Sequence, residues 1–291
     1  MKASLALTAS APAHAALDVR TPPGERLVPS VQRAMALLDR LAQQREPMSL
    51  ARLVTELSLP KSSVHGLCNT LLSMGYLHRQ SDGAFRIGPR VMTLAGAFVA
   101  GTGVAREFNA LWEPPGAALE ETVVLSVLSG TEVVYIGVHN GDRPLGLAFS
   151  VGMRLPAHLA ATGKAQLANL PVESVRESFD GVPLTPLTRH GPRRLGTLLS
   201  ELEQTLERGY AIDDEGVREG VYCIAAPVFD ASARAVAGVG VCVHKSMLGS
   251  DGGARHRDAL LRIAQQLSQR LGGTVPSPLP AAARHGRRKT S

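Results

Sequence analysis

The sequence predicts an α+β protein of two domains, a small helical one that ends in a β-hairpin and a larger one built on an antiparallel sheet. Three observations support this prediction. The chain has 291 residues, more than one hydrophobic core usually organises. Apolar residues recur at helical spacing between residues 30 and 75. Beyond residue 120, β-rich runs alternate with helical stretches, which is typical of a sheet covered by helices.

Three short helices are predicted in the N-terminal part. Ser30 is expected to cap the first helix and Ser49 the second, and Pro60 is expected in the first turn of the third. Because their apolar residues lie three and four positions apart, the helices are expected to share one core. These residues are Val31, Ala34, Leu38 and Leu41, then Leu50, Leu53, Val54 and Leu57, then Val64, Leu67, Cys68, Leu71 and Leu72.

A hairpin is predicted directly after the third helix. Gly75 is a helix stop, and the segments YLHRQ and AFRI have the composition of two short strands. Asp82-Gly83 between them is a favoured hairpin turn. Three helices followed by a hairpin is the order of a winged helix-turn-helix domain, so the pattern predicts DNA binding.

The third helix has an outward face of short polar side chains that suits DNA. Such groups can donate to phosphates and read base edges without keeping a helix out of a major groove about 12 Å wide. The hairpin arginines are expected to contact the flanking phosphates. The predicted DNA-contacting residues are Lys61, Ser62, Ser63, His65, Asn69, Thr70, Arg79 and Arg86. The polar face of the third helix, taken alone, is equally typical of a solvated surface. The hairpin that follows this helix is what favours DNA binding.

Charge supports DNA binding only in the N-terminal part. The chain has a formal net charge of +6 and a pI of about 9.6. The basic excess lies in residues 30–90 and in the tail RHGRRKTS, whereas residues 91–283 are slightly acidic. We therefore assign the nucleic-acid partner to residues 30–90.

Composition argues against several classes of protein. No uncharged apolar run reaches the roughly 18 residues of a membrane helix. The start, MKASLALTASAPAHAALDVR, is a poor secretory signal, because Thr8, Ser10 and Pro12 interrupt its apolar segment. The three cysteines have no zinc or disulfide spacing. We predict a flexible leader at residues 1–28 and a cytoplasmic protein with no membrane partner.

The rest of the chain predicts the sheet and its helices. VVLSVLSGTEVVYIGVH contains two β-rich runs joined at Ser129-Gly130, and CIAAPVFD and AVAGVGVCVH supply two more. LGTLLSELEQTLERG reads as an amphipathic helix stopped by Gly209, and ARHRDALLRIAQQLSQRLGG as the closing helix. Pro114-Pro115 are expected to end or kink the first helix of this domain.

Two nucleotide-binding patterns are incomplete. ATGKA resembles a phosphate loop, but that loop needs glycine where His158 stands and Ser or Thr where Ala165 stands. GVGVCV lacks the third glycine of a dinucleotide-binding turn and alternates like a buried strand. We therefore expect no cofactor.

Metal binding and catalysis are weakly supported. The acidic cluster Asp213, Asp214, Glu215 and Glu219 is typical of a solvated loop, and no pair of histidines stands nearby at ligand spacing. We expect no metal. An enzyme with Cys223 as nucleophile and His158 as base needs a contact that sequence does not reveal. We expect a protein that is not an enzyme and keep this alternative open.

Several segments together resemble the IclR family of bacterial transcription regulators. SVQRAMALLDRLAQ, LPKSSVHGLCNTLLSMGYL and FRIGPRVMTLA are similar to the family's DNA-binding domain and linker helix. GMRLPAHLAATGKAQLANLP, PLTPLT, LERGYAIDDEGVREGVYCIAAPVFD and AVAGVGVCV are similar to its effector-binding domain in order and spacing. The resemblance covers about residues 29–273.

The resemblance implies a domain plan and a function. It implies a winged helix-turn-helix domain at 29–88, a linker helix at 89–106 and a GAF-like α/β effector-binding domain at 107–273, before a disordered basic tail at 274–291. The protein would be a ligand-responsive, sequence-specific transcriptional regulator. Its partners would be a double-stranded DNA operator, a small organic effector and further copies of itself, as a homodimer or a homotetramer built as a dimer of dimers. Repression and activation both stay open.

The resemblance also implies an effector site, with an organic acid as the expected effector. Its residues would be Ala161, Thr162, Gly163, Asp213, Cys223, Gly240 and Cys242. A glycine-containing helix start offers N–H groups to an anion, and Asp213 suits a hydroxyl better than a carboxylate. Because Gly240 and Cys242 replace hydroxyl side chains of several family members, we expect a roomier and less polar pocket, suited to an aromatic acid.

One departure and one alternative remain. Gly66, a weak helix former, stands where the family commonly has arginine, so the operator sequence is not implied. The alternative is a GAF-like small-molecule enzyme or sensor that uses Cys223, with the N-terminal helices docked on a protein partner. A docking helix would usually expose Leu, Phe or Met rather than the small polar groups between Lys61 and Thr70.

Overall fold

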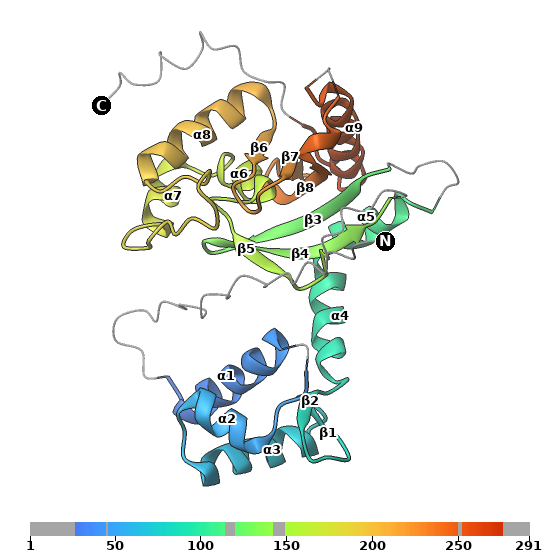
Figure 1. Cartoon of the computed structure of the whole chain (residues 1–291). Coiled ribbons are helices and arrows are strands. Elements are labelled where there is room, and N and C mark those ends of the chain that lie inside the picture. Colours follow the sequence, from blue (N-terminus) through green and yellow to red (C-terminus); the bar gives the residue numbers. More distant parts are fainter. Residues whose placement is uncertain (1–26, 45, 114–119, 142–148, 250–251, 276–291) are drawn as a thin grey trace, which may run out of the picture. The chain divides into compact units, whose positions relative to one another are not determined.

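The structure, a computed structural model, divides into two compact units at residue 98, each described here by itself (Figure 1). It describes residues 27–44, 46–113, 120–141, 149–249 and 252–275. The predicted leader at 1–28 and tail at 274–291 lie almost wholly outside these ranges, as does Pro114-Pro115. Within the described residues, no helix combines the length and the apolar character needed to cross a membrane.

The N-terminal unit has the predicted order of three helices and a hairpin. The elements are α1 (Pro29–Gln43), α2 (Leu50–Leu57), α3 (Lys61–Ser73), β1 (Leu77–Arg79) and β2 (Phe85–Ile87), followed by α4 (Val91–Thr102), which crosses the boundary between the units. Their shared core is Leu37, Leu41, Met48, Leu53, Val64, Cys68, Leu71, Leu77 and Phe85. The predicted winged helix-turn-helix is confirmed.

Of the predicted helix starts, that of α2 is confirmed and that of α1 is wrong. The Ser49 hydroxyl accepts a hydrogen bond from the Arg52 N–H (3.3 Å) and caps α2, as predicted. The prediction that Ser30 caps α1 is wrong, because α1 already begins at Pro29, whose fixed φ suits a first helical position. Val31 is consequently exposed, and Leu37 replaces it in the core.

The hairpin turn lies where it was predicted. The Gln80 N–H donates to the Ala84 carbonyl (2.8 Å) and the Gly83 N–H donates to the Gln80 carbonyl (3.0 Å). The loop therefore has three residues, and Gly83, with φ of 84°, is its left-handed member. Asp82 instead accepts a hydrogen bond from the Ala84 N–H at 2.9 Å. Asp82 and Gly83 lie in the hairpin loop as predicted, and the loop also contains Ser81.

The second unit is an antiparallel sheet of six strands. Its strands are β3 (Thr122–Ser129), β4 (Glu132–His139), β5 (Arg154–Pro156), β6 (Ala211–Asp214), β7 (Val221–Phe229) and β8 (Ala235–His244), in the order β5-β4-β3-β8-β7-β6. The four long strands are the predicted ones. The edge strands β5 and β6 were not predicted, because three or four residues are too short to show alternation.

Helices cover both faces of this sheet (Figure 1). One face packs against α6 (Ala161–Leu167), α7 (Val172–Ser178) and α8 (Leu195–Arg208), and the other against α5 (Val104–Ala110) and α9 (Ala254–Arg270). A short 3-10 turn, η1 (Lys245–Met247), follows β8. Strand alternation decides which face each residue joins, so Val124 lies in the first core and Leu125 in the second. The α+β prediction is confirmed.

Candidate functional sites

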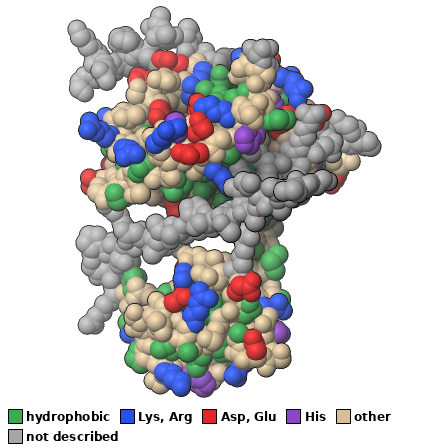
Figure 2. All heavy atoms as spheres, viewed as in Figure 1, with side chains coloured by type: hydrophobic (Ala, Val, Ile, Leu, Met, Phe, Trp, Pro, Cys, Tyr) green, Lys and Arg blue, Asp and Glu red, His purple; other side chains and the backbone are tan. Residues whose placement is uncertain are grey.

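The outward face of α3 is formed as its apolar spacing predicts. Val64, Cys68 and Leu71 are buried, and the polar residues between them point away from that core. Of the predicted DNA-contacting residues, Ser63 is half-buried, and the exposed ones are Lys61, Ser62, His65, Asn69, Thr70, Arg79 and Arg86. Figure 2 shows basic and histidine side chains along the lower edge of this unit, where Figure 1 draws α3.

The polar groups on α3 differ in whether they already form hydrogen bonds within the helix. The Thr70 hydroxyl donates to the Gly66 carbonyl at 3.0 Å, which leaves it only an acceptor role toward a ligand. Asn69 Nδ2 and His65 Nδ1 lie 3.4 Å apart and form one paired surface feature. A Cβ added at Gly66 would meet nothing within 4 Å, so this position is an open gap in the polar face. The paired amide and imidazole are the groups best placed to read base edges.

Two arginines in and after the wing, Arg79 and Arg90, lie over aromatic rings. The Arg79 guanidinium lies 5.7 Å from the centre of the Phe85 ring, and Arg90 lies 5.8 Å from that of Tyr76. Such stacking orders a long cation that would otherwise sample many rotamers. Arg90, three residues after the end of β2, was not among the predicted contacts.

A polar row crosses the apolar face of the sheet that α6 covers. Thr122 pairs with Cys242, Cys242 with Cys223, and Cys223 with Asp213, so one residue from each of β3, β8, β7 and β6 stands in line. All four are buried. Strand register therefore brings together Cys242, Cys223 and Asp213, three of the predicted effector residues, and adds Thr122, which was not predicted.

The two cysteines are paired thiols rather than a nucleophile. The Sγ atoms of Cys223 and Cys242 are hydrogen-bonded, and this bond, together with burial, raises the pKa of Cys223 well above its ordinary value. A thiol held protonated is a poor nucleophile. Burial also lowers the pKa of His158 to about 4, and His158 Nε2 has no hydrogen-bond partner among the described residues. The nucleophile and base of the enzyme alternative are therefore not in contact.

Asp213 is a buried carboxyl held by backbone groups. Its Oδ1 accepts hydrogen bonds from the N–H groups of Gly216 (2.7 Å) and Val217 (3.3 Å). Burial raises the pKa of Asp213 to about 6, while Lys164 and the two backbone bonds act in the opposite direction. The effect of burial on the pKa of Asp213 is therefore larger than the effect of the nearby Lys164.

Lys164 is the cation of this site and was not predicted as a binding residue. It is the one lysine or arginine that is buried in the described part of the chain. Its Nζ forms an ion pair with Glu201 Oε2 on α8 at 2.9 Å. The only sequence signal for this residue was the lysine of ATGKA. That lysine no longer predicts anion binding once the phosphate-loop interpretation is rejected.

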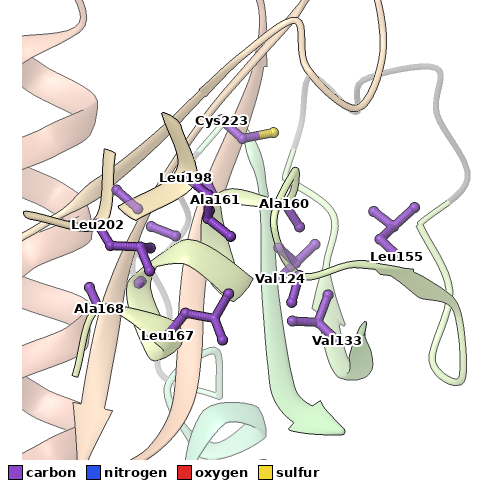
Figure 3. Packing of buried hydrophobic residues seen from close by; sticks show 14 of the residues in the cluster. Val124, Val133, Leu155, Ala160, Ala161, Leu167, Ala168, Leu198, Leu202 and Cys223 are labelled. Carbon is purple, nitrogen blue, oxygen red and sulfur yellow. The ribbon is translucent and has the colours of Figure 1, made fainter. Parts of the chain in front are cut away.

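Helix α6 lies directly on the sheet. Gln166 anchors it, because its Oε1 accepts from the Leu128 N–H at 2.9 Å and its Nε2 donates to the Thr162 carbonyl at 3.0 Å. A side chain at Gly238 would clash with that carbonyl, and one at Gly163 would clash with the backbone of Ala157. The glycine of the predicted anion loop is thus required for close packing. Figure 3 shows Ala160 and Ala161 of this region among the buried residues near Cys223.

The prediction that Gly240 makes the pocket roomier is wrong. A Cβ at Gly240 would lie 3.0 Å from Thr162 Cγ2, 3.3 Å from the Ile224 carbonyl oxygen and 3.4 Å from Val124 Cγ2. The methyl group of Thr162 already occupies the space that the missing side chain leaves. Gly240 therefore allows α6 to pack closer to β8 and does not enlarge a pocket.

Tyr135 is a further polar group of this face that sequence reasoning missed. The residue is buried in the same core as Cys223 and Cys242. Burial raises the pKa of its hydroxyl, Cys242 and Cys223 raise it further, and Thr162 lowers it, so these groups surround the hydroxyl. An inward-facing tyrosine in an apolar strand was the available signal, since a buried Tyr O–H usually needs a partner.

Comparison with known proteins gives a consistent result. A family model described as the bacterial transcriptional regulator IclR C-terminal matches residues 99–269, and one described as the IclR helix-turn-helix domain matches residues 30–81. HTH-type transcriptional regulator XynR of Escherichia coli (strain K12) is 30% identical over 249 residues, which cover 84% of this chain and 98% of that protein.

Solved structures agree with the family models. The crystal structure of the Agobacterium tumefaciens repressor BlcR is 37% identical with a TM-score of 0.55, covering 84% of this chain and 98% of that one. An IclR homologue complexed with 4-hydroxybenzoate, from Microbacterium hydrocarbonoxydans, is 20% identical with a TM-score of 0.68, covering 82% and 99%, and supports the fold alone. The named relatives are transcriptional regulators, not enzymes. The chain belongs to the IclR family of bacterial transcriptional regulators.

Proposed function

We propose that this regulator binds its operator through α3 and the wing, and that a small organic acid bound on the α6-covered face of the sheet changes its DNA affinity. The observation that supports this most directly is the buried row of polar residues on an otherwise apolar wall. Buried polar groups without full partners are costly unless a ligand or water satisfies them, and Thr122 Oγ1 has no partner among the described residues.

The N-terminal unit also has a surface suited to a second copy of this chain. Val31 and Met35 on α1 and Met92, Leu94 and Phe98 on α4 are all more than half exposed. Several large apolar side chains exposed on two helices are typical of an interaction face. We propose that this face forms a homodimer, which gives two recognition helices for two half-sites, and that dimers assemble further into a tetramer.

The proposed domain plan follows the same elements. The winged helix-turn-helix covers 29–88, the linker helix 89–106 and the effector-binding domain 107–273. Limited proteolysis is expected to release a stable C-terminal fragment that binds acid but not DNA. A fragment that binds the operator without α3 would contradict this plan.

DNA binding is tested first by its dependence on salt. If Lys61, Arg79 and Arg86 neutralise phosphates, the logarithm of affinity for DNA from upstream of neighbouring genes falls linearly with the logarithm of salt concentration. Each arginine or lysine replaced by alanine is expected to flatten that slope by about 0.9. Arg193→Ala, an exposed arginine of the second unit, is the matched control and leaves the slope unchanged. Binding that ignores salt would contradict the proposal.

Effector binding is tested by thermal shift with a set of organic acids. A ligand that binds only the folded state at a hundredfold excess over its Kd raises stability by about 2.7 kcal/mol. The same acid is expected to change operator affinity, because coupling between two sites is reciprocal. Chemical conversion of the acid by the protein would support the enzyme alternative instead.

A further inference from the structure

A stripe of exposed polar side chains runs along α3. Ser62, His65, Asn69 and Ser73 follow one another at intervals of three and four residues, and all four are exposed. This spacing places them on one side of the helix. The buried residues of α3 lie on the other side, so the stripe is the part of the helix that is free to meet a partner.

Within this stripe, His65 orients the amide of Asn69. Asn69 Nδ2 lies 3.4 Å from His65 Nδ1. An amide nitrogen only donates hydrogen bonds, so His65 Nδ1 is the acceptor and the neutral ring holds its proton on Nε2. One N–H of the amide is then used, and Oδ1 and the second N–H are left side by side. An acceptor beside a donor matches the N6–H and N7 groups of adenine in the major groove.

The other exposed positions one turn from Asn69 do not compete for its amide. Gly66 has no side chain, and a Cβ there would meet nothing within 4 Å. The Ser73 hydroxyl donates to the Thr70 carbonyl at 2.8 Å, and the Thr70 hydroxyl donates to the Gly66 carbonyl at 3.0 Å. In the part of the chain that the structure describes, His65 is the one side chain that forms a hydrogen bond with the Asn69 amide.

The charge of α3 also favours an amide as its base-reading group. An arginine that faces the groove would pair with O6 and N7 of guanine. Lys61, in the first turn, is the only lysine or arginine in the sequence of this helix, and it stands eight residues before Asn69. The exposed stripe itself has no cationic side chain of this kind, so base preference on this face falls to neutral groups.

We propose that Asn69 pairs with an adenine of the operator and that His65 is the positioning residue for this contact. Its Nδ1 holds the Asn69 amide in the orientation that fits adenine. Without the imidazole the amide can turn over, which exchanges its donor and its acceptor and removes the match. This role rests on the proposed function of α3, and it adds the identity of one base and of the residue that orients its reader.

The adenine is identified with modified DNA and the full-length protein. Selection from a pool of random-sequence duplexes gives the probe, and each of its adenines is then replaced in turn by 7-deazaadenine, which lacks the N7 acceptor but still pairs with thymine. We expect one such replacement to weaken binding by about 5- to 10-fold, because it leaves the amide N–H without its acceptor. Asn69→Ala is expected to bind the normal and the modified probe equally.

Two substitutions at position 65 separate positioning from direct contact. His65→Ala is expected to reduce the preference for the normal probe by about 2- to 10-fold, the value of one hydrogen bond. His65→Gln is expected to restore it, because the glutamine carbonyl can accept from Asn69 Nδ2 in place of the imidazole. His78→Ala, an exposed histidine of the wing, is the matched control and leaves the preference unchanged. Circular dichroism melting of each variant separates a folding defect from a binding defect.

Four results would overturn this inference. In the first, no adenine replacement distinguishes the parent from Asn69→Ala. In the second, His65→Ala keeps the full preference, and in the third His78→Ala lowers it as much. In the fourth, His65→Gln binds no better than His65→Ala, which would assign the imidazole to the DNA itself. All four leave the proposed function standing, because its salt dependence is measured separately. Failure of the parent to enrich any duplex would instead contradict the proposed function, and this role of His65 with it.

Discussion

The proposed DNA-contacting face of α3 and the buried polar row of the sheet are built by opposite means. On α3, neighbours such as His65 and Asn69 are four residues apart in sequence, and the helix itself brings them together. In the sheet, Thr122 and Cys242 are neighbours only because β3 and β8 pair in one register. The first surface is a local property of its segment, whereas the second exists only once the domain has folded. Substitutions should therefore act locally on α3 and through the whole core at the row.

The largest expected effect is the pH dependence of stability that comes from two buried groups of the second unit. Asp213 has a raised pKa of about 6, so its contribution to stability is present below its unfolded value of 3.8 and is lost as pH rises through 6. His158 has a lowered pKa of about 4, so its contribution is present above its unfolded value of 6.5 and is lost as pH falls through 4. Each shift corresponds to about 3 kcal/mol, and the two nearly cancel between pH 4 and 6.

Asp213→Asn should remove the pH dependence of stability that comes from the carboxyl and leave that of His158. We expect this variant to be up to about 3 kcal/mol more stable than the parent at pH 7 and to lose that advantage by pH 4. Urea unfolding at several pH values measures the difference. Asp214→Asn, an exposed neighbouring carboxylate, is the matched control. A pH-independent difference between Asp213→Asn and the parent would show that the pKa of Asp213 is not raised by folding.

The α3 face offers the next effect in size. Asn69→Ala is expected to relax base preference by about 1 to 3 kcal/mol at one operator position, because the amide of Asn69 is exposed and aimed outward. Protein stability should stay unchanged, in contrast to substitutions in the row. Thr55→Ala, an exposed polar residue on α2, serves as control. Binding to a set of single-base operator variants measures the effect, and a uniform loss over all of them would assign Asn69 to a phosphate instead.

The smallest effect concerns Gly66. Alanine there meets no atom, so Gly66→Ala should raise stability by about 1 kcal/mol through helix propensity alone. Gly96→Ala in α4 has the same open surroundings and should give a similar gain. Gly66→Arg is expected to strengthen operator binding relative to Gly66→Ala by adding a cation on the groove-facing side. Weaker binding by Gly66→Arg would mean that this position must stay bare to approach the DNA.

The same contrast explains what the sequence could predict. The helices and the outward side chains of α3 follow from apolar spacing, which is a local signal. Asp213, Cys223 and Cys242 were assigned only through a family resemblance, and Tyr135, Thr122 and Lys164 were missed, because no local pattern states which strand residues become neighbours. The error at Gly240 has the same origin, since the methyl group that fills its space belongs to Thr162, far away in sequence.

Close contact between α6 and β8 also constrains how this regulator can diverge. Any side chain at Gly238 would clash with the Thr162 carbonyl, and Gly240 leaves only marginal room. Under the proposed function, changes at positions 135 and 242 would alter ligand preference, since both side chains lie in the core that α6 covers. Substitution at position 238 would first have to displace a helix. The proposed effector-binding face is thus restricted at position 238 by the packing of α6.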